Sequence, residues 1–142
     1  MIRTFTKNDL SSVMEIWLEA NIRAHNFIPE KYWQENYSKV EYMLPQAEIY
    51  VYQDANMHQI LGFIGLMENY IAGIFVKESE QSKGIGCHLL NFVKGQKNNL
   101  SLSVYQKNVR AVSFYEREQF TVQSESIDKN TNEKEFVMTW IK

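Results

Sequence analysis

One short segment near the middle of the chain has the residue types of an anion-binding loop. It covers residues 81–86, with the sequence QSKGIG. It follows an apolar run at 74–76 and precedes a stretch, 87–97, whose apolar residues have helical spacing. The first N–H groups of a helix have no acceptor within the helix, and the helix dipole adds partial positive charge there. Because an ordinary strand-to-helix turn has the same pattern, the loop alone leaves both interpretations open.

Two common nucleotide-binding motifs do not fit this loop. A dinucleotide site requires G-x-G-x-x-G, but Leu89 stands where the third glycine belongs, and no acidic residue lies at 102–106. A Walker loop requires lysine and then serine or threonine after the last glycine, but Cys87 and His88 follow here. A different ligand has to be considered.

A second motif, NVRAVSFYE, covers residues 108–116 and is followed by Phe120. The two motifs, in this order, resemble the acyl-CoA loop [Gln/Arg]-x-x-G-x-[Gly/Ala] and the N-x-x-A-x-x-F-Y-E signature of the GCN5-related N-acetyltransferases (GNAT). The resemblance extends over essentially the whole chain. It is closest to a small bacterial subgroup that also has Trp in the first helix and His-x-Phe after it, here Trp17 and residues 25–27.

The resemblance implies transfer of an acetyl group from acetyl-CoA to a primary amine by direct attack in a ternary complex, without a metal. The pyrophosphate would be held by backbone N–H groups of the loop, and the pantetheine arm and thioester by the strand before it. The cofactor-binding positions implied in this way are Phe75, Val76, Gln81, Ser82, Lys83, Gly84, Ile85, Gly86, Cys87, Asn108 and Tyr115. A catalytically silent acyl-CoA-binding or regulatory protein is the alternative.

For catalysis, the resemblance implies that Tyr115 is the general acid that protonates the leaving sulfur. The base is left open. His25 titrates in a suitable range, while Glu68, Tyr70 and a chain of water molecules are alternatives. Ala72 stands where many members of the family carry an acidic residue, and Gln119 replaces a usual glycine.

Two further expectations concern a thiol and a group of aromatic side chains. Cys87, at a helix N-terminus, could have a depressed pKa and support a covalent route. Trp33, Tyr37 and Tyr42 could line the pocket for the amine, although aromatic residues at helical spacing are usually part of a core.

The spacing of apolar and turn residues predicts the elements that position these motifs. A capping box is expected at Thr6 and Asp9, and a hairpin turn at 68–69. The order of elements predicts an α/β (α+β) fold: a mixed, mostly antiparallel sheet of six to seven strands with helices on both faces. The expected strands are 1–5, 48–53, 60–67, 70–76, 100–104, 120–124 and 135–141, and the expected helices are 10–18, 29–45, 87–97 and 108–118.

The bulk composition predicts one domain, residues 1–142, with 44% hydrophobic residues and a net charge of -2. This charge gives no electrostatic case for nucleic acid. A single cysteine excludes an internal disulfide framework. With no apolar N-terminal region and no long apolar run, we expect a cytoplasmic protein that does not enter a membrane, either a monomer or a homodimer.

Overall fold

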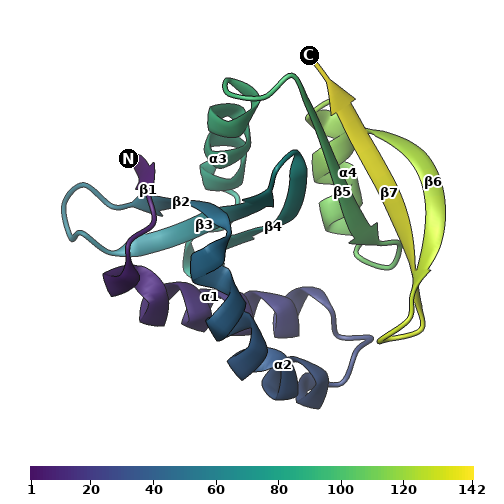
Figure 1. The fold of residues 1–142 in the computed structure, drawn as a ribbon, viewed down its shortest axis with the longest axis horizontal. Helices are drawn as coiled ribbons and strands as arrows, with labels where there is room; N and C mark the ends of the chain where they lie inside the picture. The colour runs from purple at the N-terminus through teal and green to yellow at the C-terminus, as the bar shows by residue number, and fades with distance from the viewer.

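A computed structural model describes residues 1–142, and a seven-stranded sheet runs through it in the order β1-β2-β3-β4-β5-β7-β6 (Figure 1). Every neighbouring pair is antiparallel except β4 and β5, which are parallel. The predicted mixed, mostly antiparallel sheet is therefore confirmed. The strands are Ile2–Thr4 (β1), Glu48–Gln53 (β2), Ile60–Met67 (β3), Tyr70–Val76 (β4), Asn99–Tyr105 (β5), Thr121–Asp128 (β6) and Glu133–Ile141 (β7).

Four α-helices pack on the sheet, and three short 3₁₀ turns flank them. The helices are Leu10–Ala24 (α1), Glu30–Met43 (α2), Ile85–Lys94 (α3) and Val109–Arg117 (α4), and the turns are Lys7–Asp9 (η1), Leu44–Gln46 (η2) and Glu78–Glu80 (η3). The predicted capping box of Thr6 and Asp9 is present. None of the helices is long and apolar enough to cross a bilayer.

Some predicted boundaries are wrong for identifiable reasons. Helix α3 begins at Ile85 instead of Cys87 because Gly84, in the left-handed region, already forms its N-cap, and it ends at Lys94. Strand β6 continues to Asp128 as an exposed edge strand. Its outer half carries no alternating apolar pattern, because neither of its faces is buried.

The core has two parts, one on each face of the sheet. On one face, Leu89 and Leu90 of α3 are fully buried against the strands, together with Tyr115 of α4. On the other face, Val13 and Met14 of α1 are fully buried next to Trp33 of α2. Burial of each large apolar side chain contributes roughly 1.5–3 kcal/mol, so both helix layers are fixed to the sheet. The prediction of helices on both faces is confirmed.

Strands β4 and β5 pair over a short distance and then separate. Their only register partners are Tyr70 with Ser101 and Ile71 with Leu102. The pairing of β3 with β4 skips Ala72, which is therefore the extra residue of a β-bulge. Because a bulge bends its strand and interrupts pairing, the second half of β4 diverges from β5 and leaves an opening in the sheet. This opening lies between the two strands in Figure 1.

Candidate active site

A cavity of about 1010 Å³ occupies the opening between β4 and β5. One side is formed by the loop before α3 and by the first turns of α4. The other side is formed by the end of α1, the start of α2 and the facing ends of β5 and β7. Its lining includes His25, Trp33, Phe75, Val76, Gln81, Ser82, Gly84, Tyr105, Asn108, Arg110, Tyr115 and Glu135. The cavity thus brings together both motifs and His25, which is far from them in sequence.

The loop before α3 has the geometry of an anion cradle. Gly84 adopts φ +87°, the left-handed region, and a Cβ there would meet nothing within 4 Å, so glycine is required by conformation and not by space. None of the backbone N–H groups from Ser82 to Cys87 donates a hydrogen bond within the protein. These free donors at the positive end of the α3 dipole favour a phosphate. The N–H of Gln81, by contrast, donates to the carbonyl of Glu78 (3.2 Å), which corrects the expectation that it is free.

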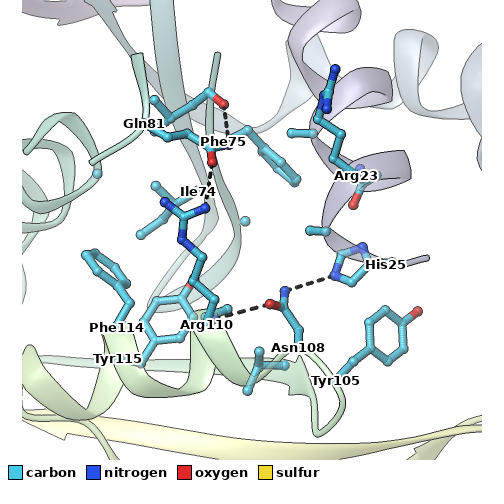
Figure 2. Close-up of a pocket in the computed structure, with 18 of the residues that line it drawn as sticks. Arg23, His25, Ile74, Phe75, Gln81, Tyr105, Asn108, Arg110, Phe114 and Tyr115 are labelled. Carbon is cyan, nitrogen blue, oxygen red and sulfur yellow. Dashed lines mark hydrogen bonds between the residues drawn. The ribbon is translucent and has the colours of Figure 1, made fainter. Parts of the chain in front are cut away.

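Side chains hold this loop in place (Figure 2). The Gln81 amide donates to the carbonyl of Val76 (3.2 Å) at the end of β4. Arg110 of α4 donates from Nη1 to Gln81 Oε1 (3.0 Å) and from Nη2 to Ser82 Oγ (2.9 Å). Ser82 itself has φ +65°, an unfavourable conformation for a residue other than glycine. Arg110 was not among the residues predicted from the sequence, although its place inside the second motif was an available signal.

Asn108 connects α4 to the end of α1. Its Oδ1 accepts from the N–H of Ala111 (3.2 Å), so the predicted N-cap is confirmed. Its Nδ2 lies 3.2 Å from His25 Nε2, as Figure 2 shows. With Nδ2 as the donor, Nε2 is the acceptor and the imidazole proton sits on Nδ1, which is buried and makes no hydrogen bond.

His25 lies in an aromatic environment that disfavours its charged form. Its ring stacks on Trp33 (centroids 5.3 Å apart) and meets the edge of Tyr105 (5.0 Å). Burial lowers the pKa of His25 from 6.5 to about 4, and the backbone of Asn21 opposes this shift only in part. His25 is therefore neutral at physiological pH and a weak proton acceptor.

Tyr115 lies on α4 at the side of the cavity formed by the second motif. The residue is 8% exposed and packs edge-on against Phe114 and Phe120. Its hydroxyl makes no hydrogen bond to another side chain or to the backbone. Burial raises the pKa of Tyr115, and the neighbouring Tyr70 adds a smaller upward shift. The phenol therefore stays protonated, the state that a proton donor needs.

The environment of Cys87 corrects the expectation of a depressed thiol pKa. Burial raises the pKa of this thiol, and Glu118, whose Oε1 lies 3.5 Å from Sγ, raises it further. These effects outweigh Asn91 and Lys94, both of which lower the pKa of the thiol. The thiol is protonated at neutral pH, which removes the basis for a covalent route.

The remaining residues considered from sequence divide between the cavity and the surface. Tyr70 and Trp33 line the cavity, whereas Tyr37 does not. Tyr42 is 76% exposed and also lies outside it. Glu68 occupies the exposed hairpin turn after β3, as predicted, and does not line the cavity.

Separated parallel strands, free N–H groups at a helix start and a buried protonated tyrosine together define an acyl-CoA-dependent transferase. A family model described as an acetyltransferase (GNAT) domain matches residues 15–137. The chain belongs to this family, and it is an acetyl-CoA-dependent N-acetyltransferase with acetyl-CoA as its cosubstrate. The resemblance drawn from the two sequence motifs is thereby confirmed.

Individual relatives agree with this assignment. The chain is 31% identical to peptidyl-lysine N-acetyltransferase YiaC of Escherichia coli over 99% of this chain and 96% of that protein. The solution structure of apo YjaB from Escherichia coli superposes with a TM-score of 0.88 at 22% identity, covering 99% of this chain and 96% of that one. A putative streptothricin acetyltransferase from Bacillus anthracis, solved with acetyl coenzyme A, gives a TM-score of 0.60 at 25% identity over 68% of this chain and 62% of that one.

Proposed function

We propose that this enzyme acetylates the side-chain amine of lysine residues in peptides or proteins, with Tyr115 as its general acid. The observation that carries the proposal is the single cavity, which continues from the loop at 81–86 past Tyr115 to His25 and Glu135. A donor bound at one end and an amine entering from the other would meet beside Tyr115. The relative YiaC is named a peptidyl-lysine N-acetyltransferase, which supports lysine as the acceptor.

The loop and its neighbours provide the cosubstrate site in this proposal. The free N–H groups of residues 82–87 hold the pyrophosphate, and Arg110 adds a positive charge beside them. The backbone of Phe75 and Val76, on the diverging half of β4, holds the pantetheine arm and polarises the thioester carbonyl. Asn108, fixed as the N-cap of α4, faces the same arm.

The acetyl transfer proceeds by direct attack in a ternary complex. The lysine ammonium first loses one proton to water. As the carbon–nitrogen bond forms and the carbon–sulfur bond breaks, Tyr115 gives its phenol proton to the departing sulfur. The phenolate then regains a proton from the new amide nitrogen. Overall, an ammonium and a thioester become an amide, a thiol and one released proton.

His25 has a positioning role in this scheme. It was a predicted base, but its Nε2 is engaged by Asn108, its Nδ1 is buried, and its pKa of about 4 is far below that of an amine. The neutral ring instead accepts from the Asn108 amide and thereby fixes the orientation of that side chain. The α1 end and the α4 start are held together in this way at the middle of the cavity.

The test measures release of free CoA with an internal-lysine peptide, spermidine and an aminoglycoside as separate acceptors. We expect the highest kcat/KM with the peptide, and mass spectrometry should locate one acetyl group on its lysine. Turnover of the small amines alone would contradict lysine as the acceptor. Tight acetyl-CoA binding without turnover on any amine would instead support the silent acyl-CoA-binding alternative.

A further inference from the structure

We propose that Glu135 of β7, with Asp128 behind it, binds the positive charge of the incoming amine and thereby selects cationic acceptors. This inference rests on the proposed function, because it assumes a cationic amine acceptor. It assigns a specificity role to a residue that neither sequence motif contains.

Glu135 lies on the acceptor side of the cavity. It lines the cavity and is directly opposite Tyr105 in the antiparallel register of β5 and β7. Residues directly opposite each other in such a pair project from the same face, so Glu135 shares the face of Tyr105. Tyr105 in turn contacts the ring of His25. The carboxylate therefore stands on the side of His25 and away from the phosphate loop.

The Glu135 carboxylate has no partner within the protein. The side chain is partly buried but makes no ion pair and no hydrogen bond, and only its backbone carbonyl accepts, from Gln106. Lys107, which lines the same cavity, pairs instead with Glu133 (3.1 Å). A carboxylate that is partly removed from water gains most from a cationic partner, and none is supplied by the chain itself.

Asp128 adds to the negative potential at this place. It accepts from the hydroxyl of Tyr105 (2.6 Å), which fixes its position behind the cavity wall. Burial and the charge of Asp128 both raise the pKa of Glu135. An ammonium group beside the two carboxylates would relieve this repulsion, whereas a neutral amine would not.

Trp33 and Tyr105, which line this side of the cavity, suit a cation with an extended apolar stem. Tyr32 of α2 lies close enough to Asp128 and Glu135 for their charges to raise its pKa. Figure 1 shows the β6–β7 turn beside the connection from α1 to α2. Faces of tyrosine and tryptophan rings attract cations and pack well against the methylene groups of a lysine.

A second observation also indicates a ligand on this side of the cavity. Trp33 is 7% exposed and lines the cavity, yet its Nε1 donor has no hydrogen-bond partner. An unpaired buried donor costs about 1–3 kcal/mol. A peptide carbonyl would satisfy it, whereas a simple polyamine offers no acceptor atom. The site therefore fits a lysine peptide better than a polyamine.

The test compares Glu135→Gln with wild type on two acceptors: an internal-lysine peptide, and the same peptide with an aminooxy group, neutral at neutral pH, in place of the ammonium. We expect KM for the lysine peptide to rise about tenfold or more, as loss of a charged hydrogen bond predicts. KM for the aminooxy peptide and for acetyl-CoA should stay within about twofold, a split that a general loss of structure would not produce. Equal loss on both peptides, or no loss on either, would overturn the inference.

Glu41→Gln is the control, because it removes one negative charge at an exposed position of α2 that makes no ion pair and lies outside the cavity lining. It should change KM for neither peptide.

If Glu135→Gln does not fold, judged by its melting temperature and acetyl-CoA affinity, Glu135→Asp takes its place and should show a smaller loss confined to the lysine peptide. If wild type does not turn over the lysine peptide, the proposed acceptor is wrong, and the same variants on spermidine still test Glu135.

Discussion

The amide nitrogen of Asn108 lies 3.2 Å from Nε2 of His25, so one contact joins the N-cap of α4 to the end of α1. The two residues are distant in sequence and come from opposite faces of the sheet. The contact forms only with a neutral imidazole, because a protonated ring has no acceptor atom. Protonation of His25 should therefore disturb both the fold and the cavity.

The first prediction concerns stability and pH. The pKa of His25 is about 4 in the folded protein and 6.5 when unperturbed, so the unfolded chain binds more protons between these values. The part of the stability that depends on neutral His25 is then fully present above about pH 6.5 and is lost as pH falls toward 4. We expect the free energy of unfolding to fall by roughly 1–2 kcal/mol more in wild type than in His25→Gln between about pH 7 and 5. Urea denaturation at both pH values measures this difference, and parallel pH dependence in the two proteins would contradict it.

The second prediction concerns Arg110 and the cosubstrate loop. Arg110→Ala removes both contacts to the loop, at Gln81 and Ser82, and also a positive charge beside the free N–H groups. We expect KM for acetyl-CoA to rise about tenfold, with kcat reduced much less, because the chemistry at Tyr115 is unaffected. Lys39→Ala, which removes an exposed positive charge of α2 that makes no ion pair and lies outside the cavity lining, is the control. Steady-state kinetics at varied acetyl-CoA concentration measures both constants. An unchanged KM for acetyl-CoA would show that Arg110 does not contribute to cosubstrate binding.

The third prediction concerns the turn after α4. Gln119 has φ +74°, a left-handed conformation, and it replaces the glycine that the family resemblance leads one to expect. The left-handed region costs a residue with a Cβ about 1–2 kcal/mol, a cost that glycine avoids. Because glycine loses more conformational entropy on folding, part of this gain is offset, and Gln119→Gly should stabilise the protein by about 0.5–1 kcal/mol. Thermal unfolding measures the change. Gln119→Ala keeps the Cβ and should give no such gain, so an equal gain in both variants would argue against conformational strain.

Much of this fold could be predicted from sequence, because its strands and helices carry regular apolar patterns. Leu89, Leu90 and Val93 of α3 are all fully buried, as their spacing indicates. The bulge at Ala72 could not be predicted, since nothing in an apolar strand marks which residue is left unpaired. The separation of β4 and β5, which follows from this bulge, could therefore not be predicted from the apolar pattern.

The site was predictable where it depends on local sequence and not where it depends on long-range contacts. Gly84 and Asn108 act through their own backbone and cap geometry, which short motifs encode. The environment of Cys87 depends on Glu118, and the environment of His25 depends on Trp33 and Tyr105. Tertiary neighbours of this kind set a pKa, and no spacing rule identifies them.

The fourth prediction tests the central claim, that Tyr115 donates the proton to the departing sulfur. Tyr115→Phe removes one hydroxyl that makes no hydrogen bond within the protein, so the fold and the loop should be preserved. Loss of a general acid typically costs 10²–10⁴ in rate, so we expect kcat on an internal-lysine peptide to fall by about a hundredfold or more. KM for acetyl-CoA should change by less than about threefold.

The decisive measurement is therefore kcat of Tyr115→Phe beside wild type, at saturating acetyl-CoA and peptide and at a pH where both proteins are folded. A fall of about two orders of magnitude with unchanged acetyl-CoA affinity is the predicted result. An unchanged kcat, with acetylated lysine still formed, would contradict the role of Tyr115 and the mechanism built on it.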